Sequence, residues 1–130
     1  MSARDIEDFG RKWDPQYFHT DASAAEASFF GGLVASGLHT LSVFQRLAVQ
    51  SLFVSWRVIA GKAIHSLRLL EPVRPDDTLS GRVTIRDLQP DGRGRSAVVL
   101  FGELDNQFGR TVMEVVVESL IVQAPPIETP

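Results

Sequence analysis

Cysteine is absent from this 130-residue chain. Its fold therefore contains no disulfides and no thiolate metal ligands, and catalysis by a cysteine nucleophile is excluded. Histidine is scarce too, with three residues at scattered positions whose spacing matches no common zinc site. We expect neither a metal ion nor a thiol-based mechanism.

Positive charge is also limited. Lys and Arg total 13 against 16 Asp and Glu, which gives a formal net charge of −3 and a pI near 5.5. Proteins that bind nucleic acid gather positive charge on one face, so we expect no nucleic-acid partner. The first ten residues lack the basic start and apolar stretch of a secretory signal. Residues 38–54, the longest apolar segment, are interrupted by polar side chains that are costly in a bilayer core. We expect a cytoplasmic protein with no membrane partner.

Length and composition favour one domain. A chain of 130 residues with 44% apolar and 22% charged side chains has the balance of an ordinary soluble globular protein. We therefore predict a single domain over residues 1–130. Residues 124–130 contain three prolines, which donate no hydrogen bond to a sheet, so we expect a frayed tail there.

Residues 36–54 carry the longest helical pattern. Apolar side chains recur every three or four residues, at Leu38, Leu41, Phe44, Ala48 and Leu52. Further apolar residues spread this stripe around most of the helix. Such a helix must be enclosed by other elements, so we expect it at the centre of the fold. Shorter helices are expected at residues 3–9 and 22–27, with a bend at Asp14 because Pro15 disfavours helix before it.

The second half of the chain reads as strands. Residues 79–88 alternate apolar and polar side chains, which predicts a strand with one solvent-exposed face. Residues 97–104 and 112–122 alternate less, as expected for strands covered on both faces. Short turns rich in Pro, Asp and Gly separate these segments, so the sheet should be antiparallel. We predict an α+β fold with a long central helix wrapped by a curved antiparallel sheet.

Two clusters could carry chemistry. Asp14 precedes His19 by five positions across a proline bend, and a carboxylate and an imidazole that share a water can move its protons. The alternative is a turn-forming Asp and a hydrogen-bonded loop His. Residues 29–40 are glycine-rich and lead into the long helix, where backbone amide N–H groups could hold a developing oxyanion. There the alternative is a tight loop whose glycines allow close packing.

Five segments together resemble the MaoC-like dehydratase and R-specific enoyl-CoA hydratase family, in which an Asp is followed five residues later by a His. They are Asp14-Pro15-Gln16-Tyr17-Phe18-His19-Thr20-Asp21, Phe30-Gly31-Gly32, Ala35-Ser36-Gly37, Pro72-Val73-Arg74-Pro75-Asp76-Asp77 and Asn106-Gln107-Phe108-Gly109. The resemblance implies a hot dog fold, pairing into a homodimer or a higher homo-oligomer, and a site for an acyl thioester of coenzyme A or acyl carrier protein. Coenzyme A would then be part of the substrate, and no separate cofactor is expected.

By the same resemblance, Asp14 and His19 would activate the water that adds to a trans-2-enoyl thioester. Gly37, with Ser36 beside it, would hold the thioester oxygen. The chain departs from the family pattern at Gln16 and Tyr17, where Asn and Pro are common, and at Ser36, where His is commoner. Asp76 replaces a usual glycine in the Pro-Gly-Asp turn. A hot dog thioesterase and a non-catalytic acyl-thioester binding module remain alternatives.

Overall fold

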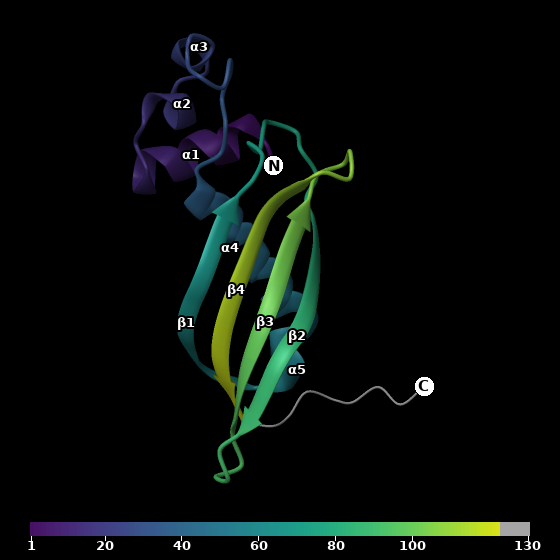
Figure 1. Ribbon diagram of the computed structural model, residues 1–130. Helices are drawn as coiled ribbons and strands as arrows, with labels where there is room; N and C mark the ends of the chain where they lie inside the picture. The colour runs from purple at the N-terminus through teal and green to yellow at the C-terminus, as the bar shows by residue number, and fades with distance from the viewer. Residues whose placement is uncertain (123–130) are drawn as a thin grey trace.

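One long helix lies across one face of a four-stranded antiparallel sheet (Figure 1). The computed structural model describes residues 1–122, so the predicted tail at residues 124–130 lies outside the described part. The helices are α1 (Ala3–Trp13), α2 (Tyr17–Thr20), α3 (Ala22–Ala25), α4 (Gly37–Ala48), the π-helical turn η1 (Val49–Phe53) and α5 (Val54–Trp56). The strands are β1 (Val58–Leu69), β2 (Ser80–Pro90), β3 (Ser96–Asp105) and β4 (Thr111–Ile121), in the order β1-β4-β3-β2. This arrangement confirms the predicted α+β hot dog fold.

The long helix follows its predicted range closely. It begins after Ser36, whose side chain caps it, and continues through α4, η1 and α5 to Trp56. The π-helical turn was not predicted. Phe44 and Ala48 are buried four residues apart, and the next buried side chain is Phe53, five residues on. The wider π turn thus keeps the buried side chains directed at the sheet.

The prediction that this helix is enclosed on all sides is wrong for a single chain. Leu38 is 53% exposed, Val49 39% and Val54 73%. Four strands cover only one side of the helix, which leaves an apolar strip uncovered beside β1. Strand β1 is an edge strand, and Ile64 on it is 56% exposed.

The predicted strands lie where the sequence pattern placed them, but the prediction that residues 97–104 and 112–122 are covered on both faces is wrong for a single chain. Residues along β3 alternate strictly between buried and half-buried positions, with Val98, Leu100 and Leu104 directed at the helix. The outward face of β3 and β4 is only partly covered, because no second layer lies over it in one chain. In β2, a bulge between Ile85 and Asp87 interrupts the predicted alternation and leaves Ile85 45% exposed.

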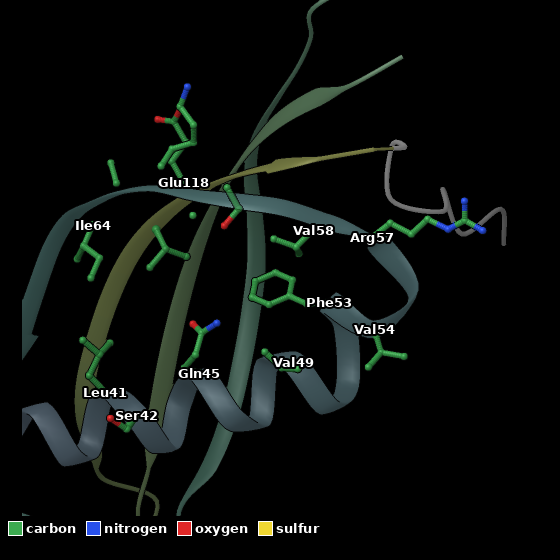
Figure 2. A pocket seen from close by; sticks show the side chains of 15 residues that line it. Leu41, Ser42, Gln45, Val49, Phe53, Val54, Arg57, Val58, Ile64 and Glu118 are labelled. Carbon is green, nitrogen blue, oxygen red and sulfur yellow. The ribbon is translucent and has the colours of Figure 1, made fainter. Parts of the chain in front are cut away.

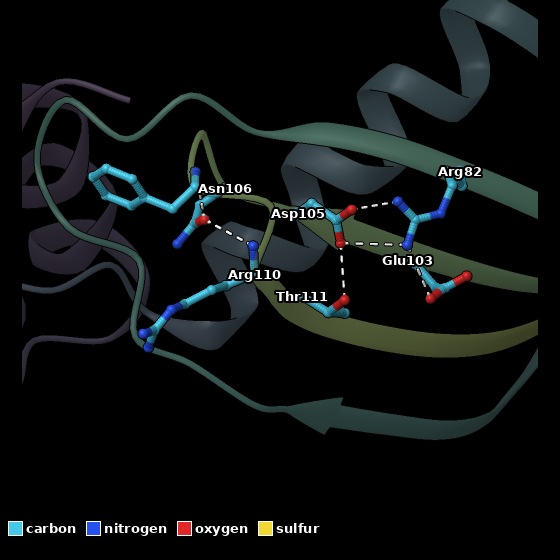
Figure 3. A network of polar contacts seen from close by, with 7 residues as sticks. Arg82, Glu103, Asp105, Asn106, Arg110 and Thr111 are labelled. Carbon is cyan, nitrogen blue, oxygen red and sulfur yellow. Dashed lines mark hydrogen bonds and ion pairs between the residues drawn. The ribbon is translucent and has the colours of Figure 1, made fainter.

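A polar network ties three strands together near the β3–β4 turn (Figure 3). The Arg82 guanidinium of β2 donates to the carboxylates of Asp105 and Glu103 on β3. Asp105 also accepts a hydrogen bond of 2.9 Å from the Thr111 hydroxyl of β4. The bonds from Arg82 and Thr111 hold the pKa of Asp105 below its usual value. Arg82 is therefore engaged in the sheet.

The first helices differ in extent from their predicted ranges. Helix α1 runs to Trp13 rather than ending near residue 9, and a capping box formed by Ser2 and Asp5 fixes its start. The single turn α2 was not predicted. It immediately follows the bend at Asp14 and carries His19.

Candidate active site

Asp14 lies at the bend between α1 and α2. Its backbone N–H donates to the Gly10 carbonyl at 2.9 Å, which closes the last turn of α1. Its φ of −152° takes the chain out of the helix, and α2 starts three residues later. The five-residue spacing therefore brings the side chains of Asp14 and His19 together, with His19 Nε2 3.4 Å from Asp14 Oδ2.

The His19 ring is buried and held in one orientation. Its Nδ1 lies 2.6 Å from the Val34 carbonyl oxygen. Because a carbonyl oxygen only accepts hydrogen bonds, we assign the ring hydrogen to Nδ1. In the neutral imidazole, Nε2 then presents a lone pair toward the Asp14 carboxylate, which is also an acceptor. Two neighbouring acceptors fit a molecule with two O–H donors, such as a water that bonds to both of them from one side.

The Asp14 carboxylate is held by two side chains. Gln16 donates from its amide to Oδ1 at 2.8 Å, and the Ser36 hydroxyl donates to Oδ2 at 2.7 Å. The hydrogen bonds from Gln16 and Ser36 lower the pKa of Asp14 below its ordinary value, and a positive charge on the nearby His19 acts in the same direction, although partial burial opposes this. Asp14 is therefore ionised at neutral pH.

Ser36 and Gly37 lie beside this pair and differ in whether their hydrogen-bond donors are free. The buried Ser36 hydroxyl donates to Asp14 and also accepts from the Leu38 N–H at 3.2 Å, so its single hydrogen is already used. The Gly37 N–H, at the first position of α4, has no hydrogen-bond partner within residues 1–122. A Cβ at Gly37 would lie 2.2 Å from Leu69 Cδ1, so a larger residue there would have to displace the exposed Leu69 side chain.

Asp14, His19 and Gly37 line one cavity of about 470 Å³. Its apolar walls include Phe18, Phe29, Phe30, Val34, Leu69, Leu70, Val73 and Val112. A carboxylate, an imidazole and a free amide thus meet in a largely apolar space, as is typical of small-molecule sites. The arrangement can hold a water beside an apolar substrate and offer an N–H to a developing negative charge.

A larger groove of about 820 Å³ lies between α4 and β1 (Figure 2). Its walls are mainly apolar, with Leu41, Val49, Phe53 and Ile64 among them. No carboxylate–imidazole pair lines this groove. We therefore assign the candidate chemistry to the smaller cavity.

The basic side chains on and next to the strands fall into two groups according to what they contact. Arg82 binds Asp105 and Glu103, Arg68 lies 4.0 Å from Glu114, and Arg86 lies over the Phe101 ring at 4.2 Å. Arg57 and Lys62 instead line the larger groove.

No helix within residues 1–122 is both long and apolar enough to cross a bilayer. In the same range, no three His, Asp or Glu side chains cluster in a way that could hold a metal ion.

Sequence reasoning missed two backbone contributions to this site. The Val34 carbonyl fixes the His19 ring, and Gly10 lies directly against His19. Neither has a side-chain chemistry that a motif search detects. Gln16 was noticed as a departure from the family pattern, but its hydrogen bond to Asp14 was not foreseen.

The fold and this pair of side chains define a hot dog protein with a carboxylate–imidazole site at the start of its long helix. The chain belongs to the MaoC-like domain family, whose model matches residues 1–105. It is 37% identical over 90 residues, 69% of this chain, to the uncharacterized protein YdeM of Bacillus subtilis (strain 168). That alignment spans 64% of YdeM.

Solved structures agree with this assignment. The MaoC-like dehydratase from Rhodospirillum rubrum superposes with a TM-score of 0.85 at 33% identity, covering 97% of this chain and 87% of that one. The R-hydratase PhaJ1 from Pseudomonas aeruginosa superposes with a TM-score of 0.78 over 100% of this chain and 86% of that one. Its identity of 21% shows a shared fold only.

Proposed function

We propose that this protein catalyses the reversible addition of water to a trans-2-enoyl thioester of the acyl-CoA type. The observation that carries the proposal is the 3.4 Å approach of His19 Nε2 and Asp14 Oδ2, two acceptors, in the cavity that also holds the free Gly37 amide. Membership of the MaoC-like family and similarity to a protein named as a dehydratase support it.

In the proposed hydration, a single water donates two hydrogen bonds, one to Asp14 and the other to His19 Nε2. His19 takes a proton as the water oxygen bonds to C3, and the electron pair of the C2–C3 double bond moves toward the thioester oxygen. The Gly37 N–H, aided by the dipole of α4, stabilises the resulting enolate. The Asp14–His19 pair then returns a proton to C2, so the product has gained one H and one OH.

Ser36 has a different role in this proposal from the one its position first suggested. Its hydroxyl is already bonded to Asp14 and to the Leu38 N–H. We therefore assign the thioester oxygen to Gly37 alone and give Ser36 the task of holding the Asp14 carboxylate. Gln16 holds the other carboxylate oxygen.

A second copy of the chain is the partner that we propose for the open side of the fold. The edge strand β1 has unpaired backbone groups along one side, and the groove beside it has the apolar side chains Val49, Val58 and Ile64 on its surface (Figure 2). A long antiparallel edge can pair with its own copy about a two-fold axis. Such a homodimer would also cover the exposed strip of α4.

An assay with crotonyl-CoA tests the proposed reaction. Loss of the enoyl absorbance without release of free thiol is expected for a hydratase. Thiol release would indicate a thioesterase instead. If neither signal appears over a range of acyl chain lengths, the proposal is wrong, and a non-catalytic binding module is the alternative that stays.

Asp14→Asn tests the mechanism. We expect turnover to fall by about 10²–10⁴-fold, the usual contribution of general acid–base catalysis, while the circular dichroism spectrum is unchanged. Asp21→Asn is a matched control, because the Asp21 carboxylate lies at the other end of α2 and accepts a hydrogen bond from the Ala24 N–H, but does not line the cavity. Full activity in Asp14→Asn would rule the mechanism out.

A further inference from the structure

Gly10 is a buried residue in the last turn of α1 and touches both Asp14 and His19. Its carbonyl oxygen accepts the Asp14 N–H at 2.9 Å. On its other side, a Cβ placed on Gly10 would lie 2.8 Å from the His19 carbonyl oxygen and 2.9 Å from His19 Cβ. Only the hydrogen of glycine fits between α1 and α2 at this point.

The space around Gly10, and not its backbone conformation, requires glycine. Its φ is not among the positive values that favour this residue, and glycine is a poor residue for a helix interior. The atoms that a methyl group would meet are backbone atoms and the Cβ of His19, which cannot rotate away as the end of a long side chain can. A methyl group would therefore have to displace α2 itself.

The direction of that displacement matters for the site. The His19 ring is bonded to the Val34 carbonyl on the far side, while Asp14 is tied to α1 through Gly10. Ordinary van der Waals contact begins near 3.4 Å, so α1 and α2 would separate by about half an ångström or more. This separation acts directly on the 3.4 Å gap between Asp14 Oδ2 and His19 Nε2.

We infer that Gly10 is a positioning residue that sets the distance between Asp14 and His19. The inference rests on the proposed hydration for its activity readout, although the geometric claim is independent of it. A larger residue at position 10 would not itself enter the substrate cavity, because Gly10 does not line that cavity, and it would act through the position of α2.

Gly10→Ala tests this inference by kinetics. With crotonyl-CoA as substrate, we expect kcat to fall by about tenfold to hundredfold, since misplacement by about 1 Å can cost about 10² in rate. KM should change less than kcat, because most of the apolar cavity walls, among them Phe30, Leu69 and Val112, do not lie on α2.

A second readout needs no activity. Nitrogen NMR of the His19 ring reports its protonation and its hydrogen bonds, and the Gly10→Ala spectrum should differ from that of the unaltered protein at His19 Nε2. If the unaltered protein does not hydrate crotonyl-CoA, the proposed function fails, and the spectrum still decides the role of Gly10.

Gly102→Ala is the matched control. Its Cβ would lie 2.3 Å from the Phe44 ring, in the core and away from the cavity. We expect this variant to be less stable but to keep kcat per folded molecule and the His19 signals unchanged. The inference is overturned if Gly10→Ala keeps its kcat and its His19 spectrum, if it behaves like Gly102→Ala, or if it fails to fold, since a local displacement leaves the fold intact.

Discussion

Replacing Ser36 with alanine removes one hydroxyl that holds two parts of the site at once. The hydroxyl caps α4 through the Leu38 N–H and donates to the Asp14 carboxylate at 2.7 Å. Loss of a helix cap costs about 1 kcal/mol, and loss of a hydrogen bond to a charged group costs about 1.5–3 kcal/mol. We therefore expect Ser36→Ala to lower the free energy of unfolding by about 2–4 kcal/mol at pH 7.

The same change should alter the pH dependence of activity. The Ser36 hydrogen bond is one of the contacts that lower the pKa of Asp14, so its loss raises that pKa and moves the acidic limb of the pH–rate profile to higher pH. The linkage to stability has a definite sign. A carboxylate whose pKa is lowered by folding stabilises the fold above its unfolded pKa of 3.8, and this contribution disappears as pH falls through the lowered value. Ser36→Ala should lose less stability than the unaltered protein over that acidic range.

The measurements are denaturant unfolding at several pH values and kcat/KM as a function of pH. Ser2→Ala serves as the control, because the Ser2 side chain caps α1 through the Asp5 N–H at 3.1 Å but lies outside the cavity. It should cost about 0.5–1 kcal/mol and leave the pH–rate profile unchanged. If both variants lose the same stability and neither profile moves, Ser36 does not hold Asp14 as described.

Three further outcomes are expected. Asp76 has a φ of 68°, so Asp76→Gly should raise the free energy of unfolding by about 0.5–1 kcal/mol in urea titrations, and a loss of stability would contradict this. Burial lowers the pKa of His39, whose ring stacks on Phe9 at 4.5 Å, so the protein should lose stability as pH falls below 6.5. His39→Phe keeps the stacking and should make unfolding between pH 7 and pH 5 less pH-dependent; equal pH dependence would refute this. Ile64→Lys should weaken the proposed dimer in sedimentation experiments without unfolding the chain, and an unchanged dimer would contradict the proposed interface.

Much of the fold could be predicted because its signals are local. The three- and four-residue recurrence from Leu38 to Leu52 predicted the long helix, and alternation and turn residues predicted the later strands. Their coverage could not be predicted in the same way. Whether Val54 or Ile64 is covered depends on how many strands curl over the helix and on whether another chain packs there, and a residue pattern contains neither fact.

The candidate site, like the fold, could be predicted only in part. The spacing of Asp14 and His19 across a proline, and a glycine at the start of the long helix, indicated which groups could meet. The sequence could not indicate what surrounds them. Gln16, two residues from Asp14, was visible only as an unusual residue.

The sequence by itself determined the long helix, the antiparallel strands and the choice of Asp14 and His19 as the candidate pair, because each depends on residues close together in the chain. The tertiary structure decided which nitrogen of His19 faces Asp14, since a carbonyl 15 residues away sets it. It also decided that Ser36, 22 residues after Asp14, donates a hydrogen bond to the Asp14 carboxylate. Such contacts join distant segments, and their geometry exists only after the helices have packed together.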